Sequence, residues 1–249
     1  CSHLALSLHT IGGGSAETSK LASALTLHYP CTYNRRHSLT TDSLKPKDKS
    51  HTIKPAIMNF LEEKIIEDGV IKEGNILKVD NFLNHQIDVD IIRQIAYELK
   101  RRFRGSEVTK ILTIEASGIA IATLLGDLYD VPVVFAKKGE TANSTDDKYV
   151  SQAYSFTHKR MNNVFVSRPY LSAGDKVLIV DDFLADGQAA KALINIVHQA
   201  GGEVVGIGIA IEKGQQQGGR ILREEGYRLE SVAILESMDY ERQEITFRH

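Results

Sequence analysis

The residues best suited to chemistry lie together in the segment 177–190. An apolar run ends in two adjacent carboxylates, Asp181 and Asp182, and a short loop with Gly187 then leads into the small residues of a predicted helix. Parallel strands place ligands at their carboxyl ends, where two carboxylates can accept hydrogen bonds from vicinal hydroxyl groups. Amides at a helix start bind phosphate, because they carry the positive end of the helix dipole. The segment predicts a sugar-phosphate site.

A second polar loop has a similar position. Glu115, Ala116, Ser117 and Gly118 follow an apolar run at 111–115 and precede a predicted helix. A strand, a tight turn and a helix start supply amides that can hold an anion. A simple strand-to-helix connection would have the same pattern, but the position at the carboxyl edge of the sheet favours binding.

The segment 177–190 also has a simpler interpretation. Asp182 could end a strand, Asp186 could cap a helix and Gly187 could form a turn. Capping requires only one acid, whereas this segment carries two at the strand end and another polar loop behind them. The complete arrangement therefore favours ligand binding.

A sheet must bring these loops together. Apolar strand candidates lie at 111–115, 131–136, 177–181, 204–212 and 227–235, and predicted helices lie at 58–68, 89–103, 119–129 and 188–199. The apolar runs are continuous rather than alternating, which is typical of strands covered on both faces. We expect an α/β fold with a mostly parallel central sheet flanked by helices.

Composition argues against several kinds of partner. The 249 residues carry a formal net charge of -2, and 42% of them are hydrophobic, as in ordinary globular proteins. The longest apolar runs are strand-sized, far shorter than the ~20 residues of a membrane-spanning helix. Both cysteines, Cys1 and Cys31, lie near the start, which fits a reducing compartment. We expect a cytoplasmic protein that binds neither nucleic acid nor membrane.

Residues 1–57 differ from the rest of the chain. They are rich in Ser and Thr and poor in acidic residues, and no helical or strand period continues through them. Met58 is the first methionine and begins an amphipathic pattern. We expect residues 1–57 to be a disordered leader, either non-native or the result of a misplaced start, and residues 58–249 to form one domain.

Five segments carry a family resemblance. The segment 177–190 resembles the phosphoribosyl pyrophosphate motif of type I phosphoribosyltransferases, and 77–86, 113–120, 154–157 and 206–213 resemble segments of the bacterial xanthine phosphoribosyltransferases. The resemblance extends from Met58 to the end. It implies a type I phosphoribosyltransferase fold with a small hood and a mobile lid loop. It also implies that xanthine and phosphoribosyl pyrophosphate become xanthosine 5'-monophosphate and pyrophosphate, in purine salvage.

The resemblance also implies roles for particular residues. Asp181 and Asp182 would act at the ribose as the catalytic carboxylates, and the loop at 115–118 would hold pyrophosphate. The 5-phosphate would bind at Ala185, Asp186, Gly187, Gln188 and Ala189. The purine would bind at Leu77, Asn84 and Lys213.

The three purine positions have ordinary interpretations as well. Leu77 taken alone reads as a core residue, Asn84 as a turn residue and Lys213 as a surface lysine. A purine nevertheless needs an apolar contact and a group that both donates and accepts hydrogen bonds. Lys213 follows an apolar strand at its carboxyl end, where its charge would favour an oxygen-rich or partly deprotonated base.

The polar segment 137–149 corresponds to the lid of related enzymes, which would exclude water from the activated sugar. A surface loop without a catalytic role is the less favoured alternative, and Lys137 and Lys138 are candidates for contact with pyrophosphate. The resemblance implies Mg²⁺ held mainly through phosphoribosyl pyrophosphate, without direct protein ligands, and a homodimer.

Three other interpretations stay open. The base could be adenine, hypoxanthine or guanine rather than xanthine. The chain could be a sensor of phosphoribosyl pyrophosphate like the purine-operon repressor, although residues 1–57 lack the helical periodicity of a DNA-binding domain. It could also bind a small molecule without catalysis.

Overall fold

The computed structural model describes residues 58–139, 147–155 and 160–249. The predicted leader, 1–57, lies outside the described residues, as does 140–146 of the predicted lid. The elements follow in the order α1 (Phe60–Asp68), β1 (Val70–Lys72), β2 (Ile76–Lys78), the π-helix η1 (Asp80–Asn84), α2 (Val89–Arg102), β3 (Lys110–Ile114), α3 (Gly118–Tyr129), β4 (Val133–Lys138), β5 (Lys148–Ser155), β6 (Arg160–Ser167), the 3₁₀ helix η3 (Arg168–Tyr170), β7 (Lys176–Leu184), α4 (Gln188–Gln199), β8 (Glu203–Lys213), α5 (Gly218–Glu224), β9 (Leu229–Asp239) and β10 (Glu244–Phe247).

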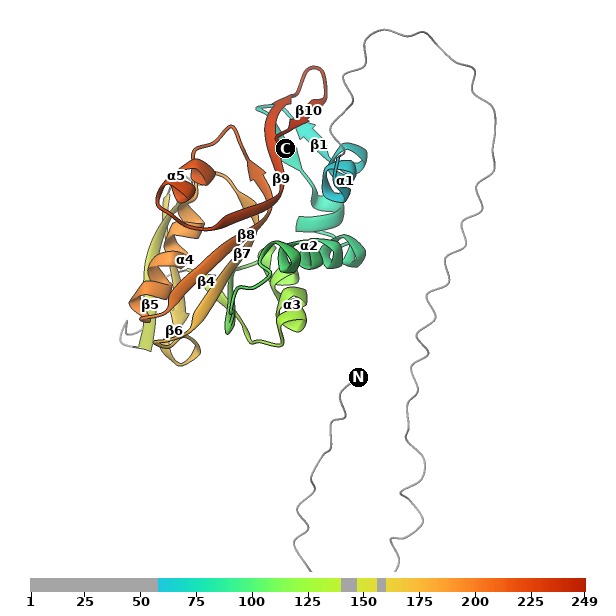
Figure 1. Ribbon diagram of the computed structural model, residues 1–249. Coiled ribbons are helices and arrows are strands. Elements are labelled where there is room, and N and C mark those ends of the chain that lie inside the picture. The colour runs from blue at the N-terminus through green and yellow to red at the C-terminus, as the bar shows by residue number, and fades with distance from the viewer. Residues whose placement is uncertain (1–57, 140–146, 156–159) are drawn as a thin grey trace, which may run out of the picture. The chain divides into compact units, whose positions relative to one another are not determined.

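An eight-stranded sheet forms the centre of the domain (Figure 1). Its strand order is β10-β9-β8-β7-β3-β4-β6-β5. The five strands from β9 to β4 are parallel, whereas β10, β6 and β5 add antiparallel pairs at the two edges. The predicted α/β fold with a mostly parallel central sheet is confirmed.

Helices cover both faces of this sheet, with α2 and α3 on one side and α4 on the other (Figure 1). Successive side chains of β7 point to opposite faces, as in any strand. Leu178 and Val180 pack in the layer that contains α1, α2 and α3, and Val177 and Ile179 pack in the layer of α4. All four side chains are fully buried. This two-sided burial explains the continuous apolar runs of the sequence.

The hood consists of α1, the β1–β2 hairpin and η1. Asn59 begins α1 with a capping box, in which its Oδ1 accepts from the amides of Leu61 and Glu62 and the Glu62 carboxylate accepts from the amide of Asn59. The Asn59 side-chain amide also donates to the carbonyl of Val232 at 2.9 Å. The same residue therefore starts the helix and attaches it to β9.

The helices fall close to their predicted positions, but the strands differ. β7 and β9 extend several residues beyond the predicted ends, to Leu184 and Asp239. The β5–β6 hairpin was missed, because its strands mix polar and apolar residues without a continuous apolar run. No helix of the described residues is long and apolar enough to cross a membrane.

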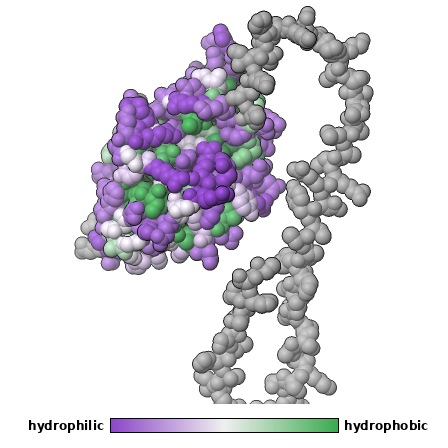
Figure 2. Space-filling view, viewed as in Figure 1, coloured by the Kyte–Doolittle hydropathy of each residue, from purple (hydrophilic) through white to green (hydrophobic). Residues whose placement is uncertain are grey.

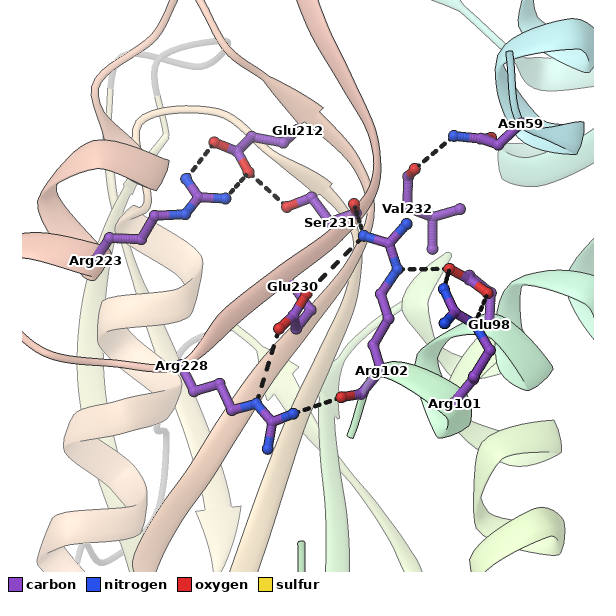
Figure 3. Close-up of polar contacts among 10 residues, drawn as sticks. All are labelled: Asn59, Glu98, Arg101, Arg102, Glu212, Arg223, Arg228, Glu230, Ser231 and Val232. Atoms are coloured by element: carbon purple, nitrogen blue, oxygen red, sulfur yellow. Dashed lines mark hydrogen bonds and ion pairs between the residues drawn. The ribbon is translucent and has the colours of Figure 1, made fainter. Parts of the chain in front are cut away.

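The surface in Figure 2 is hydrophilic across the middle of the visible face, where β9 meets α2, with smaller apolar patches around it. Charged side chains account for this region. The Arg102 guanidinium bonds the Glu98 carboxylate and the Ser231 carbonyl, and it lies near Glu230 (Figure 3). These contacts attach the end of α2 to β9.

Candidate active site

Three neighbouring strands bring the predicted site residues to one edge of the sheet. β3, β7 and β8 are adjacent and parallel, so their carboxyl ends meet at the same edge. Asp181 lies opposite Ile209, and Leu184 lies opposite Glu212. The loops after β3 and β7 and the end of β8 therefore surround one position, as open α/β sheets do at their ligand sites.

The carboxylate pair is buried before any ligand binds. Asp181 and Asp182 are each only 8% exposed, and the Asp182 amide donates to Asp181 Oδ1 at 3.0 Å. Burial raises the pKa of the Asp181 carboxyl well above its usual range, and the neighbouring Asp182 raises it further. The charge of Lys138 opposes this shift weakly. Two adjacent buried carboxyl groups such as Asp181 and Asp182 favour binding of hydroxyl donors or of a positive charge.

The loop at 115–118 lies directly against this pair. A Cβ atom on Gly118 would lie 2.9 Å from Asp181 Oδ1 and 2.3 Å from Thr113 Oγ1, so only glycine allows α3 to start here. Glu115 Oε1 accepts from the backbone amide of Lys138 at 2.6 Å, which joins the loop to the end of β4. The peptide bond between Glu115 and Ala116 is cis. The structure thus places the loop 115–118 against the first of the two predicted catalytic carboxylates.

The loop after β7 presents the start of α4. Gly187, with φ of 84°, occupies the N-cap position in the left-handed region that favours glycine. It has no side chain to cap α4, and the first turn of α4 contains no acidic residue. Asp186 Oδ1 accepts from the amide of Gln188 at 3.2 Å. The positive end of α4 is therefore suited to bind an anion, although the Gln188 amide is already bonded to Asp186.

A turn with two glycines, Gly218 and Gly219 at the start of α5 (the glycine turn), packs against the loop 185–187. The Gly218 amide donates to the carbonyl of Ala185 at 3.1 Å. A Cβ on Gly218 would lie 2.5 Å from both the Ala185 oxygen and the Gly187 nitrogen. The start of α5 and the loop 185–187 are therefore in backbone-to-backbone contact.

The end of β8 places Lys213 near the same strand. Its Nζ lies 5.6 Å from the centroid of the Phe183 ring, and the lysine is half-buried. Phe183 directly follows the two aspartates along β7. Lys213 therefore lies near Asp181, Asp182 and Gly118 at the carboxyl ends of the strands, and these three residues are called the strand-end cluster.

The other two predicted purine positions lie in the hood. Leu77 is in β2 and is buried, with 6% exposure, in the core layer of α1, α2 and α3. Asn84 ends the π-helix and is exposed. None of the hydrogen bonds found among the described residues connects either of them to the strand-end cluster. Their contact with a base stays a prediction.

Sequence reasoning missed a partly buried ion pair between Glu212 and Arg223. The Glu212 carboxylate accepts hydrogen bonds from Nη1 and Nη2 of Arg223, at 2.8 and 2.7 Å, and from the Ser231 hydroxyl at 2.5 Å (Figure 3). Burial alone would raise the pKa of Glu212, but the hydrogen bonds from Arg223 and Ser231 outweigh it and lower that pKa. The available signal was a carboxylate at the end of a long apolar strand, which requires a partner.

Known proteins are similar to this chain over most of its length. Residues 78–221 match the family model described as the phosphoribosyl transferase domain. The chain belongs to the phosphoribosyltransferase family. A xanthine phosphoribosyltransferase of Bifidobacterium animalis subsp. lactis is 54% identical over 193 residues, which cover 77% of this chain and all of that protein. Xanthine phosphoribosyltransferase 2 of Clostridium botulinum is 53% identical over 183 residues, 73% of this chain and 96% of that protein.

Solved structures of the phosphoribosyltransferase family support the fold. Adenine phosphoribosyltransferase of Rhodothermus marinus superposes with a TM-score of 0.58 and 24% identity, over 70% of this chain and 97% of that one. The Trypanosoma brucei adenine phosphoribosyltransferase, solved with AMP, pyrophosphate and ribose-5-phosphate, has a TM-score of 0.58 at 15% identity, over 70% and 79% of the two chains. At these identities the likeness concerns the fold alone.

Phosphoribosyltransferases generally use Mg²⁺ together with phosphoribosyl pyrophosphate. In the described part of this chain, no group of three or more His, Cys, Asp or Glu side chains could hold a metal ion. The buried pair of Asp181 and Asp182 nevertheless suits a nearby divalent cation, since hard cations prefer oxygen ligands and positive charge would reduce the repulsion between the carboxylates.

Proposed function

We propose that this phosphoribosyltransferase converts xanthine and phosphoribosyl pyrophosphate to xanthosine 5'-monophosphate and pyrophosphate, as a purine-salvage enzyme. One observation carries the proposal for the sugar: the buried pair Asp181 and Asp182 lies against the loop 115–118 and is followed along the chain by the loop 185–189, and both loops are suited to anions. The relatives named above, identical to the chain at 53% and 54% of aligned positions, support xanthine as the base.

In this proposal, different residues bind different parts of phosphoribosyl pyrophosphate. Amides at the start of α4, in the loop from Ala185 to Ala189, bind the 5-phosphate. Asp181 and Asp182 accept hydrogen bonds from the two ribose hydroxyls, and the loop at 115–118 binds pyrophosphate. The chain thus holds the sugar by its phosphate, its hydroxyls and its leaving group, which aligns the anomeric carbon with the base.

The reaction is a displacement at that carbon. The bond from the anomeric carbon to the pyrophosphate oxygen breaks, and its electron pair leaves with pyrophosphate. The lone pair of a xanthine ring nitrogen forms the new carbon–nitrogen bond, and the proton of that ring passes to water. Positive charge develops on the sugar as the leaving group departs. Asp181 and Asp182 stabilise that charge, and no covalent intermediate with the protein is required. When bound to the pyrophosphate oxygens, Mg²⁺ neutralises charge on the leaving group.

The end of β8 favours an oxygen-rich base. Lys213 is a cation at the strand-end cluster, where it would interact with an exocyclic oxygen or with a deprotonated ring of xanthine. Adenine carries an amino group at the corresponding position and cannot accept from an ammonium there. Leu77 and Asn84 of the hood complete the base site in this proposal, through apolar contact and hydrogen bonding.

We also propose that the enzyme acts in the cytoplasm as a homodimer. Cysteines are confined to the first 31 positions, so the sequence from 58 onward needs no oxidising environment. Light scattering of the purified protein tests the dimer, and fractionation of its own cells tests the location.

The deciding experiment measures pyrophosphate release from phosphoribosyl pyrophosphate and Mg²⁺ with xanthine, guanine, hypoxanthine and adenine offered separately. Preferential turnover of xanthine supports the proposal. Turnover of another base at equal or higher kcat/KM overturns the base assignment. Binding of phosphoribosyl pyrophosphate without release of pyrophosphate with any base overturns the enzymatic assignment and favours a sensor.

A further inference from the structure

We infer that the ion pair between Arg223 and Glu212 positions the 5-phosphate loop, so that Arg223 determines how tightly phosphoribosyl pyrophosphate binds although it does not touch it. The inference rests on the proposed function of the loop 185–189. It concerns a positioning residue, acting through the glycine turn at 218–219.

Arg223 on α5 is attached to Glu212 on β8 by two hydrogen bonds. Arg223 donates to the Glu212 carboxylate from both terminal nitrogens of its guanidinium group, Nη1 and Nη2, a geometry that fixes direction as well as distance. The Glu212 side chain is only 3% exposed, whereas that of Arg223 is 38% exposed. Ser231 on β9 occupies the other side of one carboxylate oxygen. Glu212 is therefore fixed between β9 and α5 (Figure 3).

The ion pair between Arg223 and Glu212 lies against the glycine turn. A Cβ on Gly219 would lie 1.9 Å from Glu212 Oε1 and 2.8 Å from the Arg223 guanidinium. The backbone of α5 thus lies directly on the ion pair. Any side chain at this position would have to move the carboxylate or lift the helix start.

The glycine turn also lies against the proposed 5-phosphate loop, 185–189. Gly218 donates its amide to the Ala185 carbonyl, and Gly187 in its left-handed conformation lies over the Gly218 backbone. Backbone atoms meet on both sides, with no flexible side chain between them to absorb a displacement. A shift of α5 is therefore transmitted to the amides at the start of α4.

The test compares variants of α5 in the full chain. Arg223→Met removes the anchor, and Arg220→Met is the matched control, because Arg220 forms an exposed ion pair with Glu224 on the same helix, each side chain being 59% exposed. We expect Arg223→Met to raise KM for phosphoribosyl pyrophosphate by about tenfold or more, since small displacements of binding groups have large effects. KM for xanthine should change much less. Arg220→Met should match the wild type.

A loss of folding stability must be separated from misplacement of the loop. Arg223→Met leaves the Glu212 carboxylate buried without its partner, which destabilises the fold. The double variant Glu212→Gln with Arg223→Met removes that charge and should recover thermal stability, but its KM for phosphoribosyl pyrophosphate should stay high. Arg223→Lys keeps one charged contact and should fall between wild type and Arg223→Met.

Calorimetric binding of ribose 5-phosphate tests the same loop without turnover. Weakening in Arg223→Met and the double variant, with Arg220→Met unchanged, supports the inference. Wild-type affinity in the double variant and in Arg223→Lys overturns it. If the wild type binds ribose 5-phosphate but releases no pyrophosphate with any base, the proposed function fails instead, and the two failures are distinguishable.

Discussion

Replacing Asp181 with Asn should stabilise the free protein while reducing its activity. Asp181 is buried beside Asp182, and burial followed by this neighbour raises the pKa of the Asp181 carboxyl. The native state therefore binds the proton more tightly than the unfolded state, whose aspartates titrate near pH ~3.9. Between that pH and the raised native pKa, stability falls as pH rises. Asparagine has the same shape and does not titrate, so it avoids this loss.

The size of the effect follows from the linkage. Each unit of pKa difference between the native and the unfolded state corresponds to about 1.4 kcal/mol, so the raised pKa of Asp181 makes the variant more stable than the wild type at pH 7.5. For a domain of this size, each ~1 kcal/mol of added stability raises Tm by about 2–4 °C. The asparagine oxygen can still accept from the Asp182 amide, so the local hydrogen bond is retained. In contrast, kcat should fall by about 10²–10³, as when one electrostatic stabiliser is removed from an active site.

The assay is thermal unfolding of wild type and Asp181→Asn at several pH values between 4.5 and 8, as ~half-unit steps. The difference in Tm should shrink toward the acid end, where the native carboxyl is already protonated. Asp186→Asn, in the following loop, is the control and should leave Tm nearly unchanged. A variant less stable than wild type at pH 7.5, or a gain that does not vary with pH, would refute the electrostatic reasoning.

Four further outcomes are expected. Gly118→Ala should lower kcat/KM by about 10²-fold, because its Cβ would lie 2.3 Å from Thr113 Oγ1 and 2.9 Å from Asp181 Oδ1; unchanged kinetics with an intact circular dichroism spectrum would contradict this contact. Lys213→Met should raise KM for xanthine more than KM for phosphoribosyl pyrophosphate, and equal changes in steady-state kinetics would argue against a base contact. Leu77→Ala should reduce the free energy of unfolding in urea by about 2–5 kcal/mol, and a smaller loss would mean that the hood core collapses around it. Binding of Mg²⁺ with phosphoribosyl pyrophosphate should release protons from Asp181, seen as a calorimetric heat that depends on the buffer; proton uptake would reverse the expected sign.

The sequence predicts the central strands better than it predicts the edges of the sheet. Continuous apolar runs identify β3, β4, β7, β8 and β9, because parallel strands covered on both faces leave that pattern. The β5–β6 hairpin lies at an edge, where only part of each strand is covered. Its buried Ala153 and Val164 each follow a polar residue, Gln152 and Asn163, and the apolar stretch Val164–Val166 is too short to distinguish a strand from a loop.

Contacts between neighbouring strands are harder to predict than contacts within one segment of the chain. Asp181, Asp182 and the loop 185–189 are contiguous in sequence, so one motif is enough to find them. The contact between Gly118 and Asp181 depends on β3 lying beside β7, which no local pattern specifies. Similarly, Glu212 and Ser231 meet only because β8 pairs with β9. Strand order, rather than residue type, is the missing information.

The buried aspartate pair connects stability with catalysis in the proposed mechanism. In the free protein, Asp181 and Asp182 lie together with little solvent, and the raised pKa of Asp181 reflects that unfavourable arrangement. Ribose hydroxyls donate to these carboxylates in the bound state, and positive charge on the sugar adds attraction only as pyrophosphate departs. The interaction is therefore stronger in the transition state than with the intact substrate, which is the condition for raising kcat. Glu212, in contrast, already binds both terminal guanidinium nitrogens of Arg223 in the free protein, so its charge is largely compensated.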